Sequence, residues 1–227
     1  MNQTPKAIFL YGPPGSGKGT QANLLEEHAG FYHFDIGRYL EQILNAEENK
    51  NDPEYQIQAK KFSAGELLDS NWVLKQTRAK IEQLYKEKRN VVLSGSGRTV
   101  GEVNGDEKGE GLVPILERLF GFENLLFVHV FVDAATSVER NSKRLICKAT
   151  RKVILDPSEC DGEVTQRDLD KPEVIKLRYA RYQTETIPAI QAVKDRGHEV
   201  FEVDGKQSPE EVHKQIVKLL EIKNDTH

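Results

Sequence analysis

One short stretch constrains the fold of this chain more than any other. Residues 12–20 read Gly-Pro-Pro-Gly-Ser-Gly-Lys-Gly-Thr; the apolar run 7–11 precedes them, and a helical pattern begins near Gln21. A strand, a glycine-rich turn and a helix in this order are the context of a phosphate-binding loop. Glycines allow successive backbone N–H groups to converge on an anion, and the helix N-terminus adds a partial positive charge. We therefore expect a nucleotide phosphate at the start of the first helix.

The polar residues of this loop indicate its chemistry. Lys18 is placed to reach the terminal phosphates, and Thr20 to offer its hydroxyl to a magnesium ion. The hydroxyl that usually follows the lysine comes one residue later, because Gly19 occupies that position. The alternative is a plain turn between a strand and a helix, which requires neither the lysine nor the hydroxyl in register. The residues predicted to hold the nucleotide are Gly15, Ser16, Gly17, Lys18, Gly19 and Thr20.

Composition limits the classes of protein to consider. The chain has 227 residues, 37% hydrophobic and 30% charged, which suits a large domain with a sizeable core. Its net charge of −4 argues against a general affinity for nucleic acid. The longest apolar run, 125–132, is far shorter than the roughly 20 residues of a membrane-spanning helix. Residues 1–6 show neither the charged region with a long apolar stretch nor the small-residue cleavage site that are typical of a signal peptide. We expect a cytoplasmic protein that binds neither nucleic acid nor membrane.

Strand and helix patterns alternate along most of the chain. Short apolar runs suited to buried strands recur at 7–11, 31–34, 91–93, 125–132 and 199–203, with helical patterns between them. This alternation predicts an α/β fold with a parallel sheet covered by helices on both faces.

Three segments have patterns of their own. Residues 146–166 carry both cysteines without a strong period, which is typical of a functional lid. Residues 101–111 are polar, acidic and rich in glycine, so we expect a mobile surface loop. A long helix is predicted from Lys171 to Arg196, with a kink at Pro188.

Several motifs resemble one known family. Segment 12–21 resembles the opening signature of adenylate kinases, within the wider family of nucleoside monophosphate kinases. Segment 33–40 corresponds to the family's Thr-Gly-Asp segment, and 64–68 resembles the segment that holds the acceptor base. Segment 93–99 corresponds to the family's Leu-Asp-Gly-Phe-Pro-Arg-Thr, of which the final Arg-Thr is retained. The family's four lid-flanking arginines match Arg140, Arg144, Arg167 and Arg178. The resemblance covers nearly the whole chain.

This resemblance implies an architecture and a reaction. The implied fold is a P-loop three-layer sandwich with a five-stranded parallel sheet, a helical domain that binds the nucleoside monophosphate (NMP), and a short lid. The core would comprise 1–34, 70–144 and 167–227, the NMP-binding domain 35–69, and the lid 145–166. The implied reaction is reversible transfer of the γ-phosphoryl group of Mg-ATP to AMP, giving two ADP. We expect a monomer that binds ATP, AMP and ADP and closes around them, because exchange requires an open site and transfer a dry one.

The resemblance also assigns roles to residues. Transfer between two nucleotides brings two polyanions together, so the protein must supply positive charge, alignment and exclusion of water, while no general base is needed. The fixed fork of arginine suits this task. The catalytic residues implied are Lys18, Arg98, Arg144, Arg167 and Arg178, and Arg140 is expected to pack on the ATP adenine. The alternative is that these arginines are ordinary solvated charges on amphipathic helices.

The acceptor site departs from the family pattern. The NMP-binding residues implied are Ile36, Gly37, Arg38, Glu66, Leu68, Gly95, Arg98 and Glu102. Among them, Ile36 and Arg38 replace the family's Thr and Asp. The family's phosphate-binding arginine is replaced by Glu41, whose charge would repel a phosphate, so Arg38 is expected to take that role one turn earlier.

Two further departures concern the metal and the base. The aspartate expected beside the magnesium water shell is Ser94, and Asp168 and Asp170 are candidates to restore acidity there. At the position of the family's adenine-reading glutamine stands Glu102. A carboxylate only accepts hydrogen bonds, so it matches N1–H and N2–H₂ of guanine better than adenine. The alternative is a solvated loop residue. Two rival functions therefore stay open: a kinase for GMP or a pyrimidine monophosphate, and a nucleotide-binding regulatory protein with little turnover.

The two cysteines of the chain lie in the predicted lid. Cys147 and Thr150, like Cys160 and Glu163, preserve the spacing of paired zinc ligands, and some family members bind zinc here. Two thiols are too few for the usual structural site, so we predict no zinc. A disulfide is disfavoured in a reducing cytoplasm. We expect a lid held together by hydrogen bonds.

Overall fold

A five-stranded parallel sheet lies at the centre of the molecule. The computed structural model describes residues 4–63, 68–107, 109–150, 153–154, 156–166 and 170–225. The strand order is β10-β6-β1-β3-β2, and every pairing is parallel. In that order the strands are Val200–Asp204, Leu125–Phe131, Ala7–Tyr11, Val91–Ser94 and Tyr32–Asp35. All residues of the central strand β1 are buried, which explains its continuous apolar run. The predicted α/β fold is confirmed.

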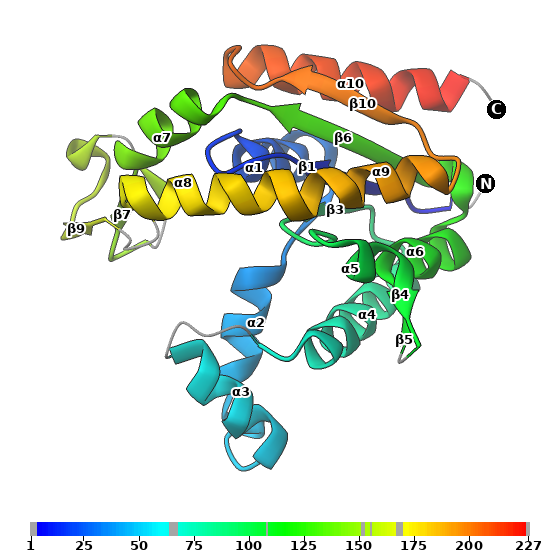
Figure 1. Ribbon diagram of the computed structural model, residues 1–227, viewed down its shortest axis with the longest axis horizontal. Coiled ribbons are helices and arrows are strands. Elements are labelled where there is room, and N and C mark those ends of the chain that lie inside the picture. The colour runs from blue at the N-terminus through cyan, green and yellow to red at the C-terminus, as the bar shows by residue number, and fades with distance from the viewer. Residues whose placement is uncertain are drawn as a thin grey trace.

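Helices alternate with these strands along the chain (Figure 1). They are α1 Lys18–Ala29, α2 Ile36–Leu44, α3 Pro53–Ser63, α4 Ser70–Lys86, α5 Val100–Asn104, α6 Leu112–Phe120, α7 Ala134–Ser142, α8 Pro172–Arg181, α9 Ile187–Asp195 and α10 Pro209–Asp225. Short 3₁₀ turns occupy Glu47–Asn49, Phe122–Asn124 and Pro157–Glu159.

The two faces of the sheet carry separate hydrophobic cores. Successive side chains of a strand point to opposite faces, so β1 sends Ile8 and Leu10 to one face and Phe9 and Tyr11 to the other. The first face packs against α1 and α10, and the second against α4, α5, α6 and α9. The result is the expected three-layer sandwich.

Helices α2 and α3 project away from the sheet (Figure 1). They share a small core with the start of α4, centred on Leu40, Leu44 and Trp72. Aspartate caps fix where these helices begin: Asp35 accepts hydrogen bonds from the first backbone N–H groups of α2, and Asp69 does the same for α4. Segment 36–63 is therefore a helical unit with its own apolar contacts.

Segment 101–111, expected to be a mobile surface loop, contains regular secondary structure. Residues 100–104 form helix α5, followed by the two-residue strands β4 (Gly105–Asp106) and β5 (Gly109–Glu110), paired antiparallel. Thr99 caps α5, and Val103 is fully buried in the core. The glycines of this segment allow close backbone contact: a Cβ on Gly111 would lie 2.2 Å from the backbone nitrogen of Gly105.

The long C-terminal helix is interrupted where the sequence predicts a kink. Between α8 and α9, residues Tyr182–Thr186 form a π-helical turn, and Pro188 is the second residue of α9. Proline has no N–H for the helical ladder, and its ring requires space on the preceding turn, so a local widening accommodates it.

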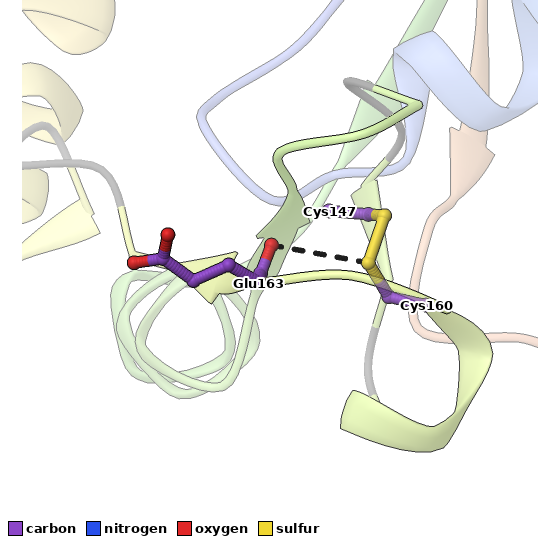
Figure 2. The surroundings of a disulfide bond; sticks show 3 residues. All are labelled: Cys147, Cys160 and Glu163. Atoms are coloured by element: carbon purple, nitrogen blue, oxygen red, sulfur yellow. Dashed lines mark hydrogen bonds between the residues drawn. A yellow bond between two sulfur atoms is a disulfide. The ribbon is translucent and has the colours of Figure 1, made fainter.

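The predicted lid contains a disulfide, which corrects the expectation of free cysteines. Strands β7 (Leu145–Cys147), β8 (Val153–Ile154) and β9 (Val164–Thr165) form an antiparallel sheet in the order β8-β7-β9. The 3₁₀ turn Pro157–Glu159 leads the chain back to Cys160, whose Cα lies 5.5 Å from that of Cys147. The two sulfurs form a disulfide (Figure 2). The disulfide therefore crosslinks this segment, and in this form neither sulfur is a thiolate that could bind zinc.

Candidate active site

The loop after β1 has the geometry of an anion-binding turn. Gly12 and Gly17 adopt positive φ angles of 145° and 94°, which side-chain-bearing residues rarely adopt. A Cβ on Gly12 would lie 2.0 Å from the carbonyl oxygen of Val130, so no other residue fits there. Gly17 then leads into the first turn of α1 without a side-chain cap. The N–H groups at this helix terminus are thus left for a ligand.

Lys18 lies folded over this loop. Its Nζ donates to the carbonyl oxygens of Gly12 and Pro13, at 2.6 and 2.8 Å, and to Ser16 Oγ at 3.2 Å. Burial, together with the smaller effect of the charges of Arg98, Arg178 and Arg144, lowers the pKa of Lys18 to about 7. Three guanidinium groups from three parts of the chain thus act on the same ammonium, a concentration of positive charge that suits a polyanion.

A buried carboxylate anchors two of these arginines. Arg144 donates to Asp170 through Nε at 3.1 Å and Nη2 at 2.5 Å, and Arg178 Nη1 lies 4.0 Å from the same carboxylate. Asp170 is fully buried, so its charge requires such partners. In the free protein the Asp170 carboxylate is paired with Arg144, and its expected contribution to acidity near a metal stays a prediction. Asp168 and Arg167 lie outside the described residues.

Arg140 bridges two loops at the edge of the sheet. Its Nη1 donates to Gly205 O at 2.6 Å and approaches Gly15 O at 3.4 Å, and its Nη2 donates to Lys206 O at 3.3 Å. The structure thus places Arg140 against the phosphate-binding loop and the turn after β10, and not in open solvent.

The second glycine-rich turn, residues 95–99, carries Arg98. A Cβ on Gly95 would meet Arg98 Nη2 at 2.8 Å, so the guanidinium lies directly against that glycine. Glu102 Oε2 accepts from the backbone N–H of Arg98 at 2.7 Å, while Thr99 Oγ1 accepts from the N–H of Glu102 at 3.1 Å. Glu102 is therefore a helix-capping residue, a role that the Thr-x-x-Glu spacing could have indicated.

The remaining predicted acceptor residues lie on or near α2. Asp35 Oδ1 accepts from the backbone N–H groups of Gly37 and Arg38 at 3.0 and 3.2 Å, and both residues are exposed on the first turn. Ile36 packs at the boundary of two apolar clusters, and Leu68 is half-buried beside the smaller one. Glu66 lies outside the described residues.

A polar chain beside the loop has no signal in the sequence. His33, the second residue of β2, places its Nδ1 2.8 Å from Asn23 Oδ1 on α1 and its Nε2 2.7 Å from Ser94 Oγ on β3. Burial lowers the pKa of His33; the nearby Asp35 carboxylate opposes this shift, and Arg38 adds to it. Strand pairing places Asp35 and Ser94 in register.

The oxygen donors near the loop suit a cation that arrives with phosphate. Within the described part of the chain, no three His, Cys, Asp or Glu side chains gather closely enough to hold a metal by themselves. Thr20 offers an exposed hydroxyl on the first turn of α1. Mg²⁺ commonly keeps several waters and binds through substrate phosphates and few protein oxygens. The residues present therefore fit magnesium bound together with a nucleotide.

Comparison with known proteins shows which sequences this chain resembles. The sequence profile described as "AAA domain" matches residues 11–153. The chain is 29% identical to an adenylate kinase of Thermosipho melanesiensis, over 94% of this chain and 98% of the relative. It is 30% identical to one of Chloroherpeton thalassium and 31% identical to one of Archaeoglobus fulgidus, each over 94% of this chain and 97% of the relative.

Helix lengths and hydropathy add one observation. None of the helices in the described ranges is both long and apolar enough to cross a bilayer.

The phosphate-binding loop and the arginines around Lys18 are consistent with the relatives, which match almost the whole chain. The protein belongs to the adenylate kinase family, as a nucleoside monophosphate kinase.

Proposed function

We propose that this protein transfers the γ-phosphoryl group of Mg-ATP to AMP, giving two ADP. The observation that supports this most is the gathering of Arg98, Arg144 and Arg178 around Lys18 at the phosphate-binding loop. ATP binding alone would not require cations from both the second glycine-rich turn and α8. Transfer between two phosphates does, because charge on the moving group and on both neighbours must be neutralised together.

The position of each group supports the role that we propose for it. Lys18 exchanges its loop carbonyl contacts for the β- and γ-phosphates, and the loop N–H groups after Gly15 hold the phosphate chain. Arg98 receives the acceptor phosphate, and Arg144 and Arg178 stabilise the charge on the group in transfer. Because both nucleotides are clamped in line, alignment replaces any need for a general base.

Magnesium enters with ATP in this proposal. The ion supplies neutralisation of the phosphate charge when it is bound. On the protein side, Thr20 offers a hydroxyl oxygen beside Lys18 at the start of α1.

The domain division belongs to the same proposal. The unit formed by α2 and α3 would be the NMP-binding domain, with Arg38 and Gly37 at its entrance from β2. The disulfide-linked sheet of β7, β8 and β9 would be the lid, and the remainder the core. The predicted monomeric state and cytoplasmic location stay predictions.

The test is an assay of ADP formation with purified protein, Mg-ATP and each of AMP, GMP, CMP and UMP. We expect AMP to be the best acceptor and Lys18→Ala to lose about a hundredfold or more in kcat/KM, as for removal of a central transition-state contact. A clear preference for another monophosphate would contradict the AMP assignment. ATP binding without transfer to any acceptor would instead support a regulatory protein.

A further inference from the structure

The chain Asn23–His33–Ser94 joins α1, β2 and β3 beside the phosphate-binding loop, and the proposed reaction has not used it. The amide oxygen Asn23 Oδ1 can only accept, so the proton between it and His33 lies on Nδ1. In the neutral imidazole the other nitrogen, Nε2, is then an acceptor. At 2.7 Å it receives the single proton of the Ser94 hydroxyl.

This arrangement determines what Ser94 can do. A hydroxyl has one donor and two acceptor lone pairs. Because the donor is directed to His33, Ser94 Oγ offers only acceptor capacity to any further group. In that respect it behaves as a carboxylate oxygen does, without the full negative charge.

The position of the Asn23–His33–Ser94 hydrogen bonds indicates which further group donates to Ser94. Ser94 is the last residue of β3 and pairs with Leu10, two residues before the loop begins. Asn23 follows Thr20 by three residues on α1, so the two side chains lie on the same face of the helix. The acceptor oxygen of Ser94 thus lies at the same edge of the sheet as the hydroxyl expected to meet magnesium.

We propose that Ser94 accepts a hydrogen bond from the hydration shell of the magnesium ion that accompanies ATP, and that His33 is the positioning residue that keeps Ser94 in this role. The inference rests on the proposed function, since that function brings Mg-ATP to the loop. Water held by Mg²⁺ is a strong donor and the ion sheds it reluctantly, so outer acceptors contribute to binding. Here a hydroxyl polarised by a histidine replaces an acidic residue.

Calorimetric titration of ATP, once with Mg²⁺ and once with EDTA, tests this without using turnover. The quantity of interest is the affinity for ATP with Mg²⁺ divided by the affinity for ATP in EDTA, called the Mg²⁺ ratio below. We expect Ser94→Ala and His33→Leu each to reduce this ratio about three- to tenfold, the worth of one hydrogen bond, with affinity in EDTA unchanged. His33→Gln keeps an acceptor near the Nε2 position and should retain most of the ratio. His28→Leu, which replaces a histidine near the C-terminal end of α1, far from the loop, is the matched control.

A second substitution separates positioning from a merely structural role. Ser94→Asp supplies an acceptor that needs no histidine. Adding His33→Leu to the Ser94→Asp variant should therefore leave the Mg²⁺ ratio unchanged. Equal loss in both backgrounds, or an unchanged ratio in Ser94→Ala, would overturn the proposal. A protein with a normal ratio that transfers no phosphoryl group would refute the proposed function and leave this inference standing.

Discussion

At the scale of single residues, the proximity of like charges shows how this site is prepared for its ligand. Lys18 lies among three guanidinium groups, and only Arg144 and Arg178 have Asp170 close by as a counter-ion. Such a cluster is costly when empty and favourable when a polyanion arrives. The lowered pKa of Lys18 is a direct expression of this cost.

This predicts proton uptake on binding. The pKa of Lys18 is lowered to about 7 in the free protein, so at pH 8 the amine is mostly neutral, and phosphate restores its charge. Mg-ATP binding at pH 8 should take up between about half and one proton through this residue. Titrations in two buffers of different ionisation enthalpy measure the uptake, and Lys18→Met should remove it. An uptake at pH 8 that is the same in both proteins would contradict the assignment.

The same shift has a consequence for stability. Because the folded pKa lies below that of an unfolded lysine, the unfolded chain binds more protons between about pH 7 and 10.5, and stability contributed through this group rises with pH across that window. Lys18→Met should therefore be more stable than the unsubstituted protein at pH 6, and the difference should shrink towards pH 10.

At the scale of elements, the helix caps explain both the shape of the site and one unusual residue. Helices α2, α4 and α5 are capped by Asp35, Asp69 and Thr99, whose side chains accept hydrogen bonds from backbone N–H groups of the first turn. Glu102 completes the cap of α5 by accepting from Arg98. The residue expected to read the acceptor base thus also holds the turn that carries a catalytic candidate.

Glu102 variants distinguish these two roles. Glu102→Gln keeps an acceptor for the Arg98 N–H, so thermal stability should change little, while Glu102→Ala should lose about 1 kcal/mol, as for loss of a helix cap. If Glu102 also contacts the base, Glu102→Gln should raise the ratio of AMP to GMP phosphorylation. An unaltered ratio would leave Glu102 as a capping residue only.

The predicted lid is the segment in which a disulfide takes the place of the expected hydrogen bonds. The disulfide closes a sequence separation of 13 residues. Reducing a disulfide that closes a loop of this length should lower the free energy of unfolding by about 3 kcal/mol, provided that this segment unfolds together with the core. Chemical denaturation with and without a dithiol reductant measures this. The double variant Cys147→Ser/Cys160→Ser should already have the lower stability and be insensitive to the reductant; a reductant effect in that variant would contradict the explanation.

At the scale of the whole molecule, the sheet presents its phosphate-binding edge between two projecting units. The α2–α3 unit extends from the end of β2, and the disulfide-linked unit extends between α7 and α8 (Figure 1). Because each unit carries its own contacts, we expect each to move as a unit when nucleotides bind.

Closure should therefore be measurable in solution. A non-hydrolysable ATP analogue together with AMP should reduce the radius of gyration seen by small-angle X-ray scattering, and either nucleotide alone should reduce it less. In Arg98→Ala, which removes the proposed contact to the acceptor phosphate, adding AMP should produce no further compaction. Identical scattering curves with and without both nucleotides would contradict a closing mechanism.

Much of this molecule was determined by local sequence. The buried run of β1, the positive-φ glycines at 12 and 17, and Lys18 are adjacent in the chain, so their joint geometry depends on short-range sterics and hydrogen bonding. The alternation of strands and helices, which is also visible in the local sequence, predicted the parallel sheet. The interruption near Pro188 follows from the missing N–H of that one residue.

Only the tertiary structure decided which distant groups meet. His33, Asn23 and Ser94 come from three elements, and Asp170 meets Arg144 across the disulfide-linked segment; neither contact leaves a local pattern. The fold of the lid likewise brought Cys147 and Cys160 to bonding distance, against an expectation based on compartment alone. Periodicity reports which face of an element is buried, whereas these pairings depend on how elements pack, and that is set by the whole core together.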